Sequence, residues 1–169
     1  GEAFSEVQTQ GEHSITYGQR FQFWLQHTPI TLAVIIASSL LTLLIGFGRD
    51  FETLRWFTFV DFSFQGQYTV YQSLETLISE GQWWRWLTPI FIHFSIIHLI
   101  FNLLWTWELG RRIELVYKPW LVILLIAVMG VISNIAQYLM TGPVFGGLSG
   151  VIFGLMAYTW LWEDRKSVV

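Results

Sequence analysis

The sequence predicts an all-α membrane protein in which several hydrophobic helices form a bundle. Two observations lead to this prediction. Hydrophobic residues make up 53% of the chain and charged residues only 12%, about half the usual charged share of a soluble domain. In addition, four apolar segments, each long enough for a helix, follow one another at residues 30–47, 89–109, 119–140 and 149–162.

The first apolar segment, residues 30–47, contains no charged residue. At a rise of about 1.5 Å per residue it nearly crosses a hydrocarbon core about 30 Å thick. Residues 1–28 are expected to form a polar tail that ends in an aromatic, interfacial segment. Residues 48–88 form a long first loop that is too charged to span, and we expect short amphipathic helices at the membrane interface there.

The other three segments suggest a polar site inside the membrane. Residues 89–109 contain two histidines and an asparagine, and polar groups at membrane depth usually face the bundle interior. In the third segment, Asn134 and Gln137 are expected to line a water-filled cavity. The fourth segment has only 14 residues, so its start must lie partway into the membrane, covered by protein or wetted. Residues 29–163 then form the membrane core and residues 164–169 a cytoplasmic end.

The distribution of basic residues predicts an orientation. With four spans, the N-terminus, the 110–118 connection and the C-terminus share one side of the membrane and hold most of the lysines and arginines. The positive-inside rule therefore places both termini in the cytoplasm and the first loop in the outer half. The net charge of −3 argues against a nucleic-acid partner. The absence of Cys excludes disulfides and thiolate metal sites.

The tetrapeptide Gly-Leu-Ser-Gly at residues 147–150 opens the fourth segment. In the first turn of a helix, Ser149 would lie beside the positive end of the helix dipole, where free backbone N–H groups bind anions. Acyl transfer needs such a place for its tetrahedral oxyanion. A structural interpretation stands beside this one. Serine often caps helices, and Gly146, Gly150 and Gly154 form a ladder of small residues suited to close helix packing.

His98 and Asn102 are four residues apart in the second segment, so they project from one helix face. Both side chains can donate hydrogen bonds to an oxyanion. His93 lies five residues before His98, about 140° away around a helix. We therefore expect His93 outside this cluster, as a structural histidine bonded to the long loop. Two histidines at this spacing are poorly placed to share a metal ion, and we predict no metal site.

The combined pattern resembles the rhomboid family of intramembrane serine proteases. The resemblance runs from about residue 21 to the end and is closest to bacterial six-helix rhomboids. It implies a rhomboid-like polytopic bundle with four of six transmembrane helices present. The matching features are His93-xxxx-His98-xxx-Asn102 in the second segment, Gly147-Leu-Ser149-Gly150 opening a short fourth one, the pair Trp84-Arg85 in the first loop, and Glu114 after the second segment.

By this resemblance, the complete protein is a serine endopeptidase that cuts peptide bonds in or near transmembrane segments of membrane-protein substrates. Ser149 would be the nucleophile, and His98, Asn102 and the Ser149 N–H would form the oxyanion hole. The general-base histidine of the family lies in the sixth helix. Helices five and six are missing here, so this fragment alone is expected to be inactive. Neither His13 nor His27, both before the first span, is a plausible substitute.

The resemblance also implies structural roles and surroundings. Trp84, Arg85 and Glu114 would anchor the first loop. Phe153 stands one turn after the nucleophile, where close relatives often have Tyr against the catalytic histidine. No metal or organic cofactor is implied. The expected partners are transmembrane substrates, the lipid bilayer and the missing helices five and six. The expected location is a bacterial inner membrane, with the N-terminus in the cytoplasm and the active site open to the outer side.

Two other interpretations stay open. A rhomboid-like protein could bind membrane helices without cutting them, although a pure binder has no need for an oxyanion hole. A transporter or channel could use the His98–Asn102 face to line a path, with the serine of the half-length helix as a ligand site. Labelling by a serine-reactive fluorophosphonate would separate a protease from both.

Overall fold

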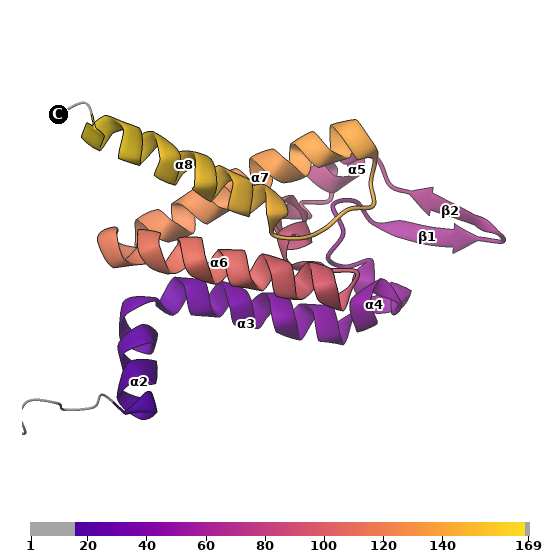
Figure 1. Ribbon diagram of the computed structural model, residues 1–169. Helices are drawn as coiled ribbons and strands as arrows, with labels where there is room; N and C mark the ends of the chain where they lie inside the picture. Colours follow the sequence, from indigo (N-terminus) through magenta and orange to yellow (C-terminus); the bar gives the residue numbers. More distant parts are fainter. Residues whose placement is uncertain (1–15, 168–169) are drawn as a thin grey trace, which may run out of the picture.

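The computed structural model describes residues 16–167, and helices dominate it (Figure 1). Residues 1–15 of the tail predicted at residues 1–28, including His13, lie outside the described part, as do residues 168–169. The α-helices are α2 (Tyr17–His27), α3 (Pro29–Leu44), α4 (Phe51–Leu54), α5 (Leu74–Ser79), α6 (Ile96–Val116), α7 (Pro119–Thr141) and α8 (Ser149–Ser167). Three 3₁₀ turns, η1 (Gly46–Gly48), η2 (Trp83–Trp86) and η3 (Thr88–Phe91), and two strands, β1 (Phe62–Gln65) and β2 (Tyr68–Tyr71), complete the fold.

The long helices run between two ends of a bundle (Figure 1). The start of α3, the α6–α7 connection and the end of α8 lie at one end. The first loop, with its antiparallel β1–β2 hairpin, lies at the other end together with the α7–α8 loop. The candidate serine at the start of α8 is therefore at the same end as the first loop.

Membrane crossing is supported by length and hydropathy for part of the bundle. Among residues 16–167, α7 alone is long and apolar enough by itself to cross a membrane. The pair α2 and α3 would count as a second span only if taken together, and it is bent by 97°. Helix α3 has 16 residues, and the last turns of α6 carry charged side chains. The number of four spans therefore stays a prediction.

Several helix boundaries differ from the sequence prediction, and α6, for example, continues to Val116, seven residues beyond the expected end at residue 109. The second apolar segment was expected to be helical from Pro89. Instead, Pro89 belongs to η3, the chain extends after it, and α6 begins at Ile96. Ser95 caps α6, because its Oγ accepts a hydrogen bond from the His98 N–H at 3.1 Å. At the other end of the chain, α8 runs on to Ser167, five residues beyond the expected end at residue 162.

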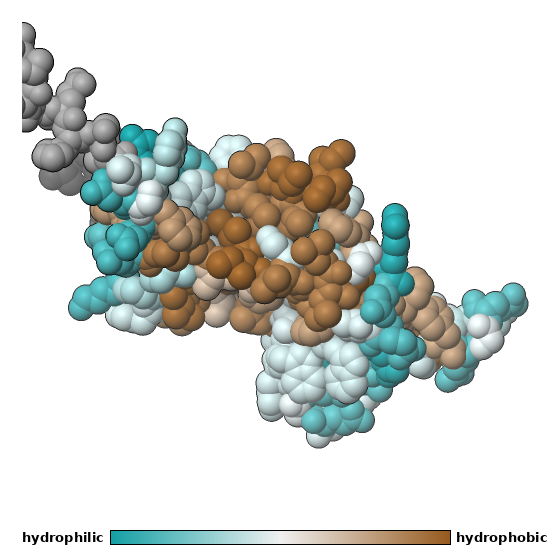
Figure 2. Space-filling model, turned by 90° about the horizontal axis from the view of Figure 1, so that it is seen from below, coloured by the Kyte–Doolittle hydropathy of each residue, from teal (hydrophilic) through white to brown (hydrophobic). Residues whose placement is uncertain are grey.

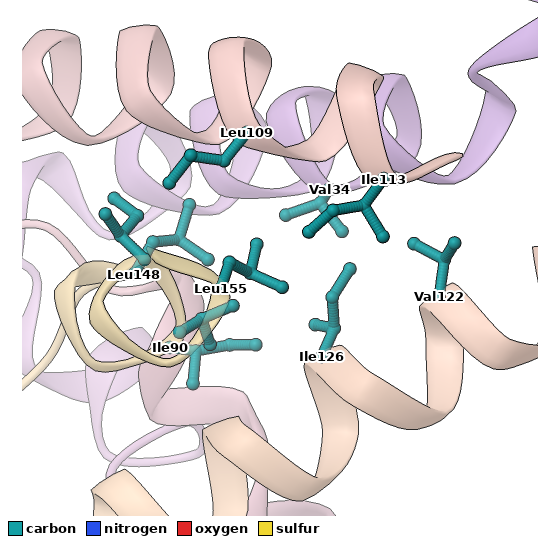
Figure 3. Packing of buried hydrophobic residues seen from close by; sticks show 10 residues of the cluster. Val34, Ile90, Leu109, Ile113, Val122, Ile126, Leu148 and Leu155 are labelled. Atoms are coloured by element: carbon teal, nitrogen blue, oxygen red, sulfur yellow. The ribbon is translucent and has the colours of Figure 1, made fainter. Parts of the chain in front are cut away.

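One hydrophobic core joins all four long helices and η3 (Figure 3). Its fully buried members include Ile90 of η3, Val122 of α7 and Leu148, which directly precedes α8. Other core residues labelled in Figure 3 are Val34, Leu109, Ile113, Ile126 and Leu155. Leu148 thus ties the loop before the candidate serine to the centre of the bundle.

Small residues allow the helices to approach closely. A Cβ on Gly150 would lie 2.3 Å from the Cβ of Ser133, and a Cβ on Gly154 would lie 2.6 Å from the Sδ of Met129. Both neighbours belong to α7. Gly150 and Gly154 therefore allow α8 to pack against α7, as the structural interpretation of this pattern predicts, whereas Gly146 lies before α8 and would meet Ile92. This packing does not exclude a catalytic role for the serine that lies between Gly146 and Gly150.

The outer surface carries a broad apolar area. Figure 2 shows hydrophobic side chains gathered on the middle of one face, with hydrophilic residues towards both ends. An apolar area of this extent on a soluble monomer is unusual and marks contact with lipid or a partner. Exposed apolar side chains of α3 and α6 include Ile36, Leu40, Leu43, Leu44, Ile97, Ile100, Phe101 and Leu104.

Candidate active site

Ser149 is the first helical residue of α8. The Leu148 carbonyl accepts the hydrogen bond of the Ile152 N–H at 2.9 Å, which makes Leu148 the N-cap. By helix geometry, the N–H groups of the first turn have no partner within the helix. They point towards the loop in front of Ser149. This arrangement, expected from the sequence, suits an anion or a developing oxyanion.

The loop before Ser149 is held against the segment that follows η3. The Gly147 N–H donates to the Pro89 carbonyl at 3.0 Å. A Cβ on Gly146 would lie 2.7 Å from the Ile92 carbonyl oxygen. Gly147 has a φ of +111°, a conformation that residues with a side chain rarely adopt. The position of Ser149 is therefore fixed by backbone contacts that only glycines allow.

His98 and Asn102 both reach this loop from α6. A Cβ on Gly147 would lie 3.0 Å from the His98 Nε2 and 3.7 Å from the Asn102 Nδ2. Asn102 is 1% exposed, and its Nδ2 has no hydrogen-bond partner among residues 16–167. Buried amide groups normally have partners. Two donor side chains thus converge two residues before Ser149, and one of them is an unused donor.

The prediction that His93 lies outside this cluster was wrong. Its ring is centred 5.0 Å from the ring of His98, and its Nε2 accepts a hydrogen bond from the Leu148 N–H at 3.4 Å. The Nδ1 lies 3.2 Å from the Phe91 carbonyl and 3.5 Å from the Thr42 Oγ1. The predicted separation of about 140° around a helix does not apply, because residues 92–95 are not helical. His93 therefore connects the loop before Ser149 with α3. None of these contacts is with the first loop, residues 48–88.

Arg85 lies near the end of the first loop along the chain, and it is buried, with 1% of its surface exposed. Its Nη1 donates to the carbonyls of Arg55 and Thr58 at 2.7 and 2.9 Å, and its Nε donates to Gln82. The neighbouring Trp84 is partly exposed, and its Nε1 donates to the Trp56 carbonyl at 2.8 Å. Both residues hold segments of the first loop together.

An ion pair supports the same loop. Asp61 accepts two hydrogen bonds at 2.9 Å from the guanidinium of Arg55, and a nitrogen of Arg85 lies 3.9 Å away. Burial on its own would raise the pKa of the Asp61 carboxyl. The hydrogen bonds from Arg55 and a backbone N–H, together with the two positive charges, outweigh burial and keep this pKa below its usual value. Burial lowers the pKa of Arg85.

Glu114 does not anchor the first loop, contrary to the sequence prediction. It lies at the opposite end of the bundle and caps α3. Its carboxylate accepts hydrogen bonds from the N–H groups of Ile30 and Thr31 at 2.7 and 2.8 Å, and from the Thr31 hydroxyl at 2.7 Å. The N-cap residue of α3, Thr28, makes no such bond with its own side chain. A carboxylate at a helix N-terminus also complements the helix dipole.

Two further expectations concern α7 and α8. Asn134 was expected to line a water-filled cavity, but it is buried and its Nδ2 donates to the Trp86 carbonyl at 2.8 Å. It fastens α7 to the first loop instead, while Gln137 is half-buried. Phe153, one turn after Ser149, is 70% exposed. Its ring is therefore available to a neighbour outside the described residues.

Comparisons with known proteins identify the family to which the sequence belongs. The Rhomboid domain family matches residues 80–168. Rhomboid protease GlpG of Yersinia pestis (strain Pestoides F) is 34% identical over 140 residues, which are 83% of this chain and 45% of the relative. Rhomboid protease GlpG of Photorhabdus laumondii is 33% identical over 140 residues, 83% of this chain and 44% of the relative.

The chain therefore belongs to the rhomboid family. It spans less than half the length of the curated relatives that it matches. The matched family region contains the second, third and fourth apolar segments and every candidate site residue named above.

The sequence did not predict that Thr42 and Asp61 contact residues of the candidate site and the first loop. Thr42 is a buried polar residue of α3 beside His93, and only its place in an apolar helix marks it. Asp61 sits in a loop with several acids, so its pairing with buried Arg85 had no local signal. Ser95, by contrast, was a readable N-cap signal for α6.

Proposed function

We propose that this chain is part of an intramembrane serine endopeptidase in which Ser149 is the nucleophile. The observation that carries the proposal is the unpaired Nδ2 of buried Asn102, directed with His98 at the loop before Ser149. A buried donor without an acceptor is unfavourable by about 1–3 kcal/mol. A transient oxyanion, present only during the reaction, would be its acceptor.

The reaction needs a base that takes the proton of the serine hydroxyl. In the proposed sequence, the Ser149 Oγ attacks the substrate carbonyl carbon, and the proton moves to a histidine. The oxyanion accepts hydrogen bonds from His98, Asn102 and the Ser149 N–H. The C–N bond then breaks, and the histidine protonates the leaving amine. In the second half of the reaction, the histidine takes a proton from water, the resulting hydroxide attacks the acyl carbon, and the Ser149 Oγ leaves and is protonated again.

We place the general-base histidine in a segment that this chain does not include. His27 belongs to α2, at the far end of the bundle, and its Nδ1 lies 2.7 Å from the Phe23 carbonyl. His93 is engaged with Leu148. The exposed ring of Phe153 lies on the helix that carries Ser149 and offers a stacking surface for the missing imidazole. The present chain alone should therefore not cut substrates.

We also propose the membrane setting and the supporting roles. Trp84 and Arg85 keep the first loop folded over the end of the bundle where Ser149 lies, and Glu114 fixes the start of α3. The apolar area of the bundle faces lipid, four helices cross, and substrates are membrane proteins cut in or near a transmembrane segment. The N-terminus is cytoplasmic in a bacterial inner membrane, and the active site opens outwards, in accordance with the positive-inside rule.

The test uses the full-length protein with a transmembrane substrate and a fluorophosphonate probe. Ser149→Ala should abolish both cleavage and labelling. His98→Ala and Asn102→Ala should each lower turnover by about 10²–10³, with non-additive effects because both act on one oxygen. Cleavage by the Ser149→Ala variant would refute the assignment of Ser149 as the nucleophile. A folded wild type that is neither labelled nor active would favour a helix-binding or transport function.

A further inference from the structure

The short helix α2 (Tyr17–His27) stands almost perpendicular to α3, with an angle of 97° between them. Contacts hold this bend. The Thr28 N–H and hydroxyl both donate to the Trp24 carbonyl, at 2.8 and 2.7 Å, and Pro29 starts the new helix. The ring of Trp24 packs edge-on against Trp107 of α6 at 5.2 Å. The direction of α2 is therefore set by the bundle.

Helix α2 has one apolar and one polar face. At 100° per residue, Tyr17, Phe21 and Leu25 form one stripe, and they are 91%, 61% and 44% exposed. Trp24 borders the same stripe and faces α6. The opposite side carries the exposed glutamines Gln19, Gln22 and Gln26. The ring of Phe23 lies at the edge of this polar side and stacks on His27. Trp24 therefore contacts the bundle, while the neighbouring stripe of Tyr17, Phe21 and Leu25 is left largely uncovered by the described residues.

Basic residues gather near this helix. Arg20 is exposed on α2 itself. On α6, Arg111 lies over the Trp24 ring, with 5.8 Å between its Cζ and the ring centroid. Arg111 and Arg112 both pair with Glu108, so this group as a whole remains positive. Positive charge beside an aromatic, amphipathic helix matches the anionic headgroups of a bilayer surface.

We propose that α2 lies in the plane of the membrane at the boundary between headgroups and acyl chains. Its apolar stripe dips into the acyl chains, and its glutamine face meets water. The occupant of this surface is phospholipid, because its anionic headgroups complement Arg20 and Arg111 while its acyl chains cover the exposed apolar stripe. The proposal rests on the membrane-spanning part of the proposed function, and it gives α2 the task of fixing the depth of this end of the bundle.

The 169 residues of this chain contain no Cys, so the experiment removes any cysteine that lies elsewhere in the full-length protein before a new one is introduced. Single cysteines replace three exposed residues of the full-length protein: Phe21 on the apolar stripe, Gln22 on the polar face, and Leu104 in the middle of α6. Each is labelled with an environment-sensitive fluorophore. The protein is reconstituted in vesicles of phosphatidylethanolamine and phosphatidylglycerol. Quenching is measured with aqueous iodide and with lipids that carry a nitroxide near the headgroup or deep in the acyl chain.

The expected results differ at the three positions. Phe21→Cys should be quenched most by the shallow nitroxide and several-fold less by iodide than Gln22→Cys. Leu104→Cys should be quenched most by the deep nitroxide. If Leu104→Cys responds as proposed but Phe21→Cys behaves like Gln22→Cys, α2 does not lie in the membrane surface. If Phe21→Cys is shielded from iodide but not quenched by nitroxide lipids, protein covers the stripe and the proposal also fails. Failure at Leu104→Cys would instead refute the membrane-spanning bundle.

Discussion

Replacing Gly147 by alanine should disable catalysis by displacing one side chain. The new methyl group would lie 2.8 Å from the Cε1 and 3.0 Å from the Nε2 of His98, closer than van der Waals contact allows. The imidazole must move away from the loop before Ser149. Loss of a single oxyanion donor lowers turnover by about 10²–10³, so we expect a fall of at least this size. The strained φ of +111° adds about 1–3 kcal/mol of destabilisation.

The same loop provides a matched control. Gly142 has a φ of +93°, but a Cβ there would meet nothing within 4 Å. Gly142→Ala therefore introduces comparable backbone strain without touching His98. We expect both variants to lose similar stability and only Gly147→Ala to lose most of its turnover.

The assay measures turnover of a transmembrane substrate by the full-length protein, next to equilibrium unfolding in mixed micelles. The fluorophosphonate labelling rate reports on Ser149 separately from substrate binding. Equal loss of turnover in Gly147→Ala and Gly142→Ala would show that strain alone is responsible. Normal turnover in Gly147→Ala would refute the assignment of His98 as an oxyanion donor.

Three further predictions concern stability, each read from equilibrium unfolding. Glu114→Gln should lower the free energy of unfolding by about 1.5–3 kcal/mol, since it weakens charged hydrogen bonds to the start of α3. Glu108→Gln, at a partly exposed ion pair, should have a clearly smaller effect. Gly150→Ala should lower it by about 1–3 kcal/mol and by more than Gly154→Ala, because the first methyl meets a rigid Cβ and the second a movable thioether; equal losses would contradict this reasoning. Because the pKa of Asp61 is lower in the folded than in the unfolded protein, its ionised carboxylate stabilises the fold at pH values above the unfolded pKa of about 3.9. The difference in free energy of unfolding between the wild type and Asp61→Asn should therefore shrink as the pH falls below about 4. A difference that does not change with pH would contradict this expectation.

The sequence was sufficient for features that depend on local pattern. The start of α8 at Ser149 and the common face of His98 and Asn102 follow from tetrapeptide chemistry and from the spacing of four residues. The apolar helices follow from composition. These features need no knowledge of which segments meet, and the structure places His98 and Asn102 together at the loop before Ser149.

The sequence was insufficient where a residue acts across the fold. Glu114 was predicted to anchor the first loop. Its hydrogen-bond partners are instead Ile30 and Thr31, which are more than 80 positions away in the sequence and lie at the end of the bundle opposite the first loop. His93 was placed by helical geometry, although the chain at Pro89 forms a 3₁₀ turn and then extends. The β1–β2 hairpin had no expected counterpart at all. Its strands are short and aromatic, and they lie in a loop that we expected to form interfacial helices.

The unpaired amide of Asn102 provides a test of the proposed oxyanion role against a purely structural polar contact. The buried hydroxyls of Ser38 and Thr106 also lack a partner, but hydroxyls in helices can rotate towards a backbone carbonyl of the preceding turn. The buried Nε1 of Trp86 lacks a partner among the described residues as well, but the Asn102 amide differs in lying beside the loop before Ser149. As an unpaired buried donor, it should destabilise the resting protein by about 1–3 kcal/mol. Asn102→Leu, which has a similar volume, should therefore leave the free energy of unfolding unchanged or raise it, while turnover falls by about 10²–10³. A marked loss of stability in this variant would mean that the amide has a structural partner, and the oxyanion assignment would lose its main support.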